Sequence, residues 1–362
     1  MSRNYVVFGG PRSLFTRKLT AALDFYEADY SIVDRSPFEK DVYQERANTH
    51  QIPLLKTPED WVLADTTPML RMLDGRFPTR CLFPSGALGV IAAIVEEVLD
   101  EWIARVMVHY RWHYDENALH VLSKGSGRKL QHSDLQDFEI YRWGPRACRA
   151  TGTELPSQQR AAEDEYIGML ESLENQLSLT RYALGDRPSA IDAILLGGLR
   201  AHTLADPVPD LSRFEQILAW EKSCDEGWDG NGDWAPFPES TPFVNHILSI
   251  AETEYKPFVL GNARALLNKK KIFDIQRHEW MPMLCEFKNA LMYSYGIWSV
   301  GSQAVSQAFG RFSGIGSDAL RKSSGFTKSQ AIQQFAMGLA GTYSQTSLVH
   351  QNFGVVAVGN SE

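Results

Sequence analysis

Short apolar runs and amphipathic segments alternate along the first ninety residues of the chain. Residues 5–8 are apolar and rich in β-formers, and the turn-forming residues 9–11 follow them, which predicts a strand. In residues 19–26 the apolar positions recur at the i, i+3, i+4, i+7 spacing of one helical face. This spacing predicts a helix that is buried along that face.

A β-hairpin and a further helix are predicted next. The apolar residues 53–55 and 61–63 flank a four-residue turn, and residues 31–33 predict another strand before them. Pro68 predicts the start of a helix that runs to about Leu73, because proline suits the first helical turn. The predicted order is β-α-β followed by β-β-α, which indicates an α/β domain.

Turn formers in residues 83–86 mark the expected end of this domain, which we assign to residues 1–84. Beyond them, apolar residues recur with helical spacing, which predicts an all-α domain over residues 85–271. The polar residues 115–135 inside it predict an exposed loop. The predicted helices include residues 91–102, 166–177 and 190–202.

The last part of the chain differs in composition. From Ala290 to Glu362 only six residues are charged, and Ser, Gly, Gln and Ala are common instead. So low a charge is not typical of a solvated disordered tail. We therefore assign residues 272–362 to a C-terminal extension whose role the sequence leaves open.

Charge and cysteine content restrict the class of protein. The net charge of -8 (36 basic against 44 acidic residues) gives no basic excess, so we expect no nucleic-acid partner. No apolar stretch is long enough to predict a membrane span. Four scattered cysteines predict neither a disulfide framework nor a zinc site. No secretory signal is evident, so we expect a cytoplasmic protein.

Ser13 and Thr16 lie between the first predicted strand and helix. A hydroxyl group at a helix N-terminus can donate a hydrogen bond to an anion, which the helix dipole also favours. The segment contains no cysteine. These residues are therefore candidates for stabilising a thiolate, and ordinary helix capping is the alternative explanation.

Two later segments carry candidate binding residues. Ile52 and Pro53 begin a predicted strand, where a cis peptide bond would leave the Ile52 backbone free to pair with a peptide-like ligand. Asp65 and Thr66 come just before a predicted helix, whose free N–H groups can hold a carboxylate while Asp65 meets an amino group. Each segment alone is equally compatible with a cap or a turn.

In this order, the three segments resemble the glutathione transferase superfamily. Residues 13–18 match its Ser-x-(Phe/Tyr)-x-Arg-Lys pattern, residues 52–55 its (Val/Ile)-Pro-x-Leu pattern, and Asp65-Thr66 its (Glu/Asp)-Ser pair, with Thr replacing Ser. Residues 184–193 match a capping-box motif of the helical domain, in which Ser189 and Asp192 have a folding role. The resemblance covers roughly residues 4–270.

The resemblance implies a thioredoxin-like domain followed by an all-helical domain. It also implies glutathione as cosubstrate, conjugation of its thiolate to a hydrophobic electrophile, and a homodimer. Ser13, or else Thr16, would activate the thiol. Ile52 and Pro53 would pair with the glutathione backbone, and Asp65 with Thr66 would hold its γ-glutamyl end. Arg12 and Leu14 depart from the serine-type pattern.

The acceptor pocket is expected along the first long helix of the second domain. Phe15, His109, Trp112 and His113 are the candidate wall residues, and ordinary packing is the alternative. His109 and His113 are four residues apart, but no third metal ligand is signalled, so we expect no metal site. Residues 229–233 resemble the start of a calcium loop without its later ligands, which favours a simple turn.

A second function class stays open on the same fold. Some members of the superfamily, including metaxin-like proteins, bind little glutathione and serve structural roles. The alternative to an enzyme is therefore a non-catalytic binding or scaffold protein that uses residues 272–362 as its partner surface.

Overall fold

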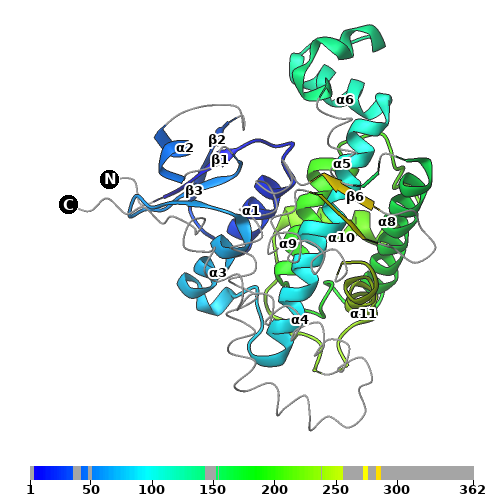
Figure 1. The fold of residues 1–362 in the computed structure, drawn as a ribbon. Helices are drawn as coiled ribbons and strands as arrows, with labels where there is room; N and C mark the ends of the chain where they lie inside the picture. Colours follow the sequence, from blue (N-terminus) through cyan, green and yellow to red (C-terminus); the bar gives the residue numbers. More distant parts are fainter. Residues whose placement is uncertain are drawn as a thin grey trace.

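The computed structural model describes residues 4–35, 42–47, 51–142, 152–153, 155–237 and 239–255, and the backbone of two paired strands, β5 (Ile272–Ile275) and β6 (Met283–Glu286). A small sheet domain lies beside a larger bundle of helices (Figure 1). Apart from those two strands, the C-terminal extension predicted at residues 272–362 lies outside the described residues.

Four strands form the sheet in the order β2-β1-β3-β4. β1 runs parallel to β2 and antiparallel to β3, and β3 forms a hairpin with β4. The predicted strands and the predicted hairpin are confirmed. Their bounds are Tyr5–Gly9 for β1, Tyr30–Asp34 for β2, Leu54–Lys56 for β3 and Val62–Ala64 for β4.

Both faces of the central strand β1 are buried. Val7 pairs in register with Leu55 and packs on the face covered by α1 (Leu14–Phe25). Phe8 points to the other face, where its ring lies 4.1 Å from that of Tyr43 in α2 (Val42–Ala47). Successive side chains of a strand alternate between faces, so helices on both sides leave no polar position in the strand centre.

Helix α3 (Thr66–Arg76) begins earlier than predicted. Asp65 is its N-cap and accepts a hydrogen bond from the N–H of Thr67 at 3.2 Å. Pro68 therefore occupies the third helical position instead of the first, which is tolerated because the first N–H groups of a helix have no intrahelical partner. The start expected at Pro68 was wrong because the cap, not the proline, sets the boundary.

The second domain consists of helices in the part of the chain that the structure describes. One long helical path runs from α4 (Gly86–Glu97) through a π-helical turn (Val98–Ile103) into α5 (Ala104–His113). No helix among the described residues is long and apolar enough to cross a bilayer. The other main helices are α8 (Pro156–Leu177), α9 (Ala190–Gly198), α10 (Glu215–Glu226) and α11 (Pro242–Ile250).

The predicted capping box at the start of α9 is present. The Asp192 carboxylate accepts the N–H of Ser189 at 2.8 Å and the N–H of Ala183 at 2.9 Å. Burial raises the pKa of Asp192 to about 6. Its contacts are all within the helical domain, which agrees with a folding role.

The two domains meet where α1 packs on α9. A Cβ atom at Gly197 would lie 2.8 Å from both the Leu14 carbonyl oxygen and the Lys18 amide nitrogen. Glycine is therefore required for the two helix backbones to approach this closely. This contact places the N-terminus of α1, with Ser13, next to the helical domain.

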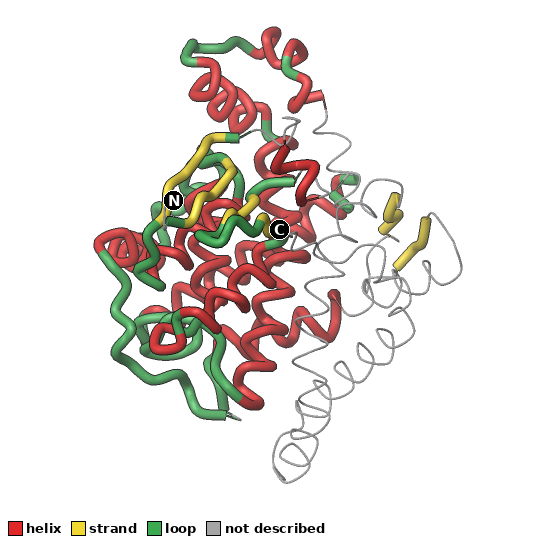
Figure 2. The backbone as a smooth tube through the Cα atoms, turned by 90° about the vertical axis from the view of Figure 1, so that its left-hand side faces the viewer, coloured by secondary structure: helices red, strands yellow, loops and turns green. Residues whose placement is uncertain are grey.

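The loop predicted at residues 115–135 was wrong. Residues Asp115–Ser126 form helix α6, and a 3₁₀ turn follows at His132–Asp137 (Figure 2). Most of the polar positions are at least partly exposed, Asn117 being the buried exception in α6, and the few apolar ones meet in a small core of their own. That core consists of Ala118, Val121, Leu122, Leu130 and Leu135, with Trp112 and Phe138 packed against it.

Candidate functional site

A cavity of about 720 Å³ lies between the sheet domain and the helical domain. Its walls come from the β1–α1 loop, the end of β2, the loop before β3, the start of α3, the path from the π-helical turn through α5, and α6. All of the residues predicted for the site line this cavity except Thr16, His109 and His113. The fold thus brings together residues as far apart in the chain as Gly10 and His202.

Ser13 is the N-cap residue of α1 and lines the cavity. Its Oγ atom accepts the N–H of Thr16 at 3.2 Å, and its own N–H donates to the Gly10 carbonyl at 3.0 Å. Among the described residues nothing accepts the Ser13 hydroxyl hydrogen. The hydroxyl is therefore oriented by the backbone and able to donate to an anion in the cavity.

Thr16, the other candidate activator, is placed differently. It is 2% exposed and does not line the cavity. A Cβ atom at Gly9 would lie 2.4 Å from its Oγ1, so its side chain packs against β1. Less than one helical turn beyond the cap, the side chain points into the sheet domain and cannot reach a ligand beside Ser13.

The loop before β3 supplies Ile52 and Pro53 to the cavity wall. Their peptide bond is cis, as the resemblance implied. Gln51 lines the cavity beside them. This stretch precedes the first paired residue of β3, Leu54, so its backbone lies at the end of a strand where a ligand backbone can pair with it.

Asp65 has a backbone conformation that is rare outside glycine, with φ of 72°. Its carboxylate caps α3 through one oxygen, while the buried Oδ2 has no partner among the described residues. Burial, and then the charge of Asp100, hold the pKa of Asp65 well above its usual range. Thr66, which also lines the cavity, follows at the helix N-terminus. The unpaired oxygen fits a cationic ligand group.

A buried ion cluster lies beneath Asp65. The Nζ atom of Lys18 contacts the carboxylates of Asp100, at 2.6 Å, and Glu96, and the Thr67 hydroxyl at 3.3 Å. Although burial alone would lower the pKa of Lys18, the two carboxylates raise it. Burial raises the pKa of Asp100 to about 6, with Lys18 opposing the shift. Asp100 belongs to the π-helical turn and lines the cavity.

Part of the cavity wall is apolar and aromatic. Phe15 comes from α1, Val108 and Trp112 from α5, and Phe138 and Ile140 from the segment after α6. This wall joins the main core to the small core around α6. It can exclude water from a hydrophobic ligand.

His109 and His113 lie outside the cavity. The His109 ring is buried, stacks on His113 with 4.7 Å between ring centres, and places its Nε2 2.7 Å from the Glu163 carboxylate of α8. Neither histidine lines the cavity, because this face of α5 packs on α8, while Trp112 lines the cavity. Burial lowers the pKa of His109.

The residues that the structure describes hold no group of three His, Cys, Asp or Glu side chains arranged for a metal ion. In the segment that resembled a calcium loop, Asp229 accepts the N–H of Asn231 at 2.9 Å and pairs with Arg181. The first contact forms a turn, and the ion pair with Arg181 joins this turn to the loop that contains Arg181.

Cavity residues that were not predicted from the sequence include the polar residues Arg12, Asp100, Arg111 and His202. Arg12 was noted only as a departure from the serine-type pattern, and Asp100 lay inside a stripe interpreted as apolar. Arg111 lies in the same segment as His109, Trp112 and His113 but was not chosen as a site residue, and His202 carried no local signal. Their roles depend on partners about ninety or more residues away in the chain, so no spacing rule could have found them.

Comparison with models of protein families and with curated proteins finds no match. Similar solved structures include a glutathione S-transferase from Rhodospirillum rubrum F11, at 14% identity and a TM-score of 0.43, covering 60% of this chain and 86% of that one. The β-etherase LigF from Sphingobium sp. strain SYK-6 is 13% identical with a TM-score of 0.46, covering 68% and 99%. A glutathione S-transferase from Methylobacillus flagellatus KT, solved with glutathione bound, is 14% identical with a TM-score of 0.42, covering 61% and 94%.

The fold itself is defined by the order of elements. A β-α-β unit, then a cis-proline loop, a β-hairpin and a helix make a thioredoxin-like domain, and the helices from Gly86 onward make the second domain. This order of elements agrees with the thioredoxin-like domain and the all-helical domain that the sequence resemblance implied.

Proposed function

We propose that this protein is a glutathione transferase-like enzyme that conjugates the glutathione thiolate to a hydrophobic electrophile. One observation carries the proposal: Ser13, Ile52-Pro53 and Asp65-Thr66, from three separate segments, line one cavity. In this proposal residues 1–84 bind glutathione, and residues 85–271 supply the acceptor side of the cavity.

Different polar groups of the cavity bind different parts of glutathione. The unpaired Oδ2 of Asp65 accepts from the γ-glutamyl ammonium group, and the N-terminus of α3 at Thr66 holds the adjoining carboxylate. Ile52 and Pro53 pair with the peptide backbone. These contacts bring the thiol towards the N-terminus of α1.

Ser13 then activates the thiol. Its hydroxyl hydrogen donates to sulfur, and this hydrogen bond stabilises the thiolate over the thiol, which lowers the thiol pKa. The N-terminus of α1 adds positive potential at the same point. The thiol gives up its proton to water, and the thiolate sulfur forms a C–S bond with the electrophile held against Phe15 and Trp112. In a substitution the leaving group departs with the electron pair of its broken bond, and in an addition the resulting carbanion takes up a proton from water.

We also propose a cytoplasmic homodimer. Cys81 and Cys224 are free thiols, which suits a reducing compartment. The dimer rests on the resemblance to the superfamily. Light scattering of the purified full chain at micromolar concentration measures it, and the mass of a single chain would contradict it.

Calorimetric titration with glutathione tests the proposed function. Asp65→Asn should weaken glutathione binding about 10- to 100-fold, because the negative charge facing the ammonium group is lost while asparagine tolerates the positive φ. Asp60→Asn is the matched control. Asp60 also has a positive φ, of 70°, but it pairs with Lys56 on the surface and does not line the cavity.

Retention on glutathione-agarose with elution by free glutathione gives a second measurement. Binding without turnover of a generic aryl halide would favour the non-catalytic alternative on the same fold. Absence of both retention and calorimetric binding in the wild-type protein would reject the proposed function.

A further inference from the structure

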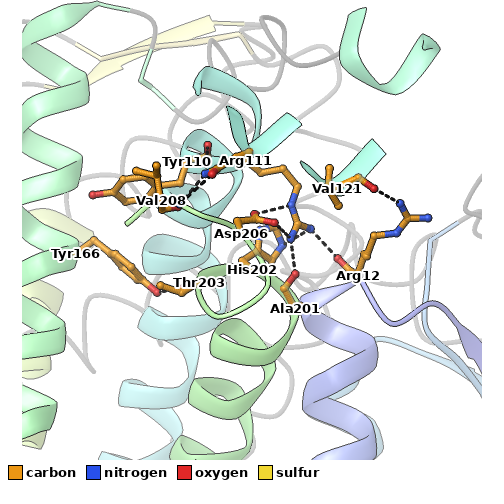
Figure 3. A network of polar contacts seen from close by, with 11 residues as sticks. Arg12, Tyr110, Arg111, Val121, Tyr166, Ala201, His202, Thr203, Asp206 and Val208 are labelled. Carbon is orange, nitrogen blue, oxygen red and sulfur yellow. Dashed lines mark hydrogen bonds and ion pairs between the residues drawn. The ribbon is translucent and has the colours of Figure 1, made fainter. Parts of the chain in front are cut away.

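Arg111 lies at the centre of a buried polar network between α5 and the segment after α9 (Figure 3). Its Nε and Nη2 atoms donate to the two carboxylate oxygens of Asp206, at 2.9 and 3.0 Å, and Nη2 also donates to the Ala201 carbonyl. The side chains of Arg111 and Asp206 are 4% and 2% exposed. The guanidinium group is therefore fixed in place with its charge balanced.

The third nitrogen of this guanidinium, Nη1, reaches the sheet domain. It donates to the carbonyl oxygen of Arg12 at 3.0 Å. Arg12 directly precedes Ser13, whose N–H is bonded to Gly10 at 3.0 Å. The peptide unit before Ser13 is thus held at both ends: the local turn holds its N–H, and the helical domain holds its C=O.

The side chain of Arg12 extends the network to α6. Its Nη1 donates to the Val121 carbonyl at 2.9 Å, and a Cβ atom at Gly125 would lie 2.3 Å from the same nitrogen. Arg12 therefore packs directly on α6, next to the cavity wall that Val121 and Gly125 form. In Figure 3 the two arginines span the distance from Asp206 to Val121.

We propose that Arg111 is the positioning residue for Ser13, and that through Arg12 it also fixes the α6 wall of the acceptor side. This inference rests on the proposed function. Arg111 acts through the Arg12 carbonyl and not through its charge, because Asp206 neutralises that charge. The neighbouring His202, whose Nε2 lies 3.4 Å from Arg111 Nη1, adds no charge to the network. Burial and then Arg111 hold the pKa of His202 well below the usual value, so its ring is neutral.

The position of Ser13 matters because thiolate stabilisation depends on a single hydrogen bond. A reacting group displaced by about 1 Å can lose up to ~100-fold in rate. A serine held only by its local turn could move with the β1–α1 loop. The contact from Arg111 ties it to the domain that carries the acceptor.

The experiment compares Arg111→Lys with Arg105→Lys in the full chain. Arg105, on the same helix, forms a pair with Glu165 at 3.0 Å that is also buried, with side chains 6% and 9% exposed, but it does not line the cavity. Arg111→Lys should lower kcat/KM about 10- to 100-fold and shift the thiol ionisation limb of the pH profile up by roughly half to one unit. Arg105→Lys should leave that limb in place.

Hydrogen exchange of the amides in residues 10–19 gives a readout that does not require turnover. Arg111→Lys should speed exchange there by about tenfold, because one stabilising hydrogen bond is removed. Unchanged exchange, or an equal change in Arg105→Lys, would overturn the inference. If wild-type protein fails to bind glutathione, the proposed function fails, while this measurement still decides the positioning role.

Two further variants separate folding from positioning. Arg111→Met combined with Asp206→Met removes both charges, so the chain keeps no unpaired buried ion and still lacks the contact to Arg12. It should reproduce the faster exchange, and wild-type exchange would contradict the inference. Arg12→Met removes the contact with α6 but keeps the backbone carbonyl that Arg111 binds. It should therefore raise the acceptor KM without changing the apparent pKa of the thiol in the pH profile. A change in that apparent pKa would also contradict the inference.

Discussion

The ammonium group of Lys18 lies 2.6 Å from the carboxylate of Asp100, which joins the first helix of the sheet domain to the π-helical turn of the helical domain. Both side chains are buried at the domain interface. Lys18 also contacts Glu96, and Thr67 donates to Glu96 at 2.8 Å. One cation thus balances carboxylates of the other domain directly beneath the cavity.

Lys18→Met should strongly destabilise the protein. Removing the cation leaves Glu96 and Asp100 buried without their partner, which typically costs about 3–5 kcal/mol. Lys56→Met is the control, because Lys56 forms a surface pair with Asp60 at 3.2 Å and should change stability by less than about 1 kcal/mol. Urea unfolding measures both, and equal losses would show that the buried cluster is not stabilising.

Glu97 should make stability depend on pH. Burial, and then the charge of Glu96, raise its pKa from 4.5 to about 8, and the Tyr255 hydroxyl donates to it at 2.8 Å. Between these values the folded state keeps a proton that the unfolded chain has released, so stability falls as pH rises through this window and levels off above it. Below about pH 4.5 the contribution of Glu97 to the free energy of unfolding is fully present.

Glu97→Gln isolates this effect. The amide keeps the shape of the protonated acid without titrating, so the wild type should lose more stability than the variant between about pH 5.5 and about pH 8, on the order of 2 kcal/mol. The difference between the two proteins cancels the opposite contribution of buried His109 and His202, whose lowered pKa values favour the folded state as pH rises. Parallel pH profiles would contradict the prediction.

Ser13→Ala and Thr16→Val should have different consequences. Ser13→Ala removes the cap of α1 and the donor to sulfur, so we expect a loss of about 1 kcal/mol in stability and about 100-fold in kcat/KM. Thr16→Val keeps the shape of a side chain whose buried Oγ1 has no partner among the described residues. It should keep activity within about twofold. Conjugation assays and thermal unfolding test both, and loss of activity only in Thr16→Val would reverse the assignment.

Trp112→Ala should raise the acceptor KM about tenfold while changing the glutathione KM little. Its ring is part of the apolar wall, and removing it exposes a hydrophobic ligand to water. His113→Ala is the neighbouring control, because His113 is exposed and stacks on His109 away from the cavity. Initial rates at varied acceptor concentration measure the difference. A larger effect in His113→Ala would place the acceptor on the other face of α5.

The loop predicted at residues 115–135 was wrong because, in this segment, exposed polar residues outnumber buried apolar residues. In α6 the spacing of Ala118, Val121 and Leu122 is helical, but charged and small residues around it gave the appearance of a loop. These three side chains gain much of their apolar environment from residues outside the helix, among them Leu130, Leu135 and Phe138. Because the small core around α6 contains few residues, the helical pattern of apolar positions that it leaves in the sequence is weak.

The sequence by itself determined the features that arise within a few residues. The strands, the cap at Ser13, the proline at position 53 and the Ser189–Asp192 capping box each depend on local backbone geometry, so their residue types are visible in order along the chain. The resemblance to the superfamily followed from that order.

Only the tertiary structure decided which of these side chains share a cavity. Ser13 and Thr16 differ by less than one helical turn, yet one faces the cavity and the other faces β1. Contacts such as that of Arg111 with the Arg12 carbonyl, 99 positions apart, join residues whose spacing carries no information. The packing of α1 on α9 determines these contacts. When two helix faces are buried against each other, close packing determines which side chains become neighbours.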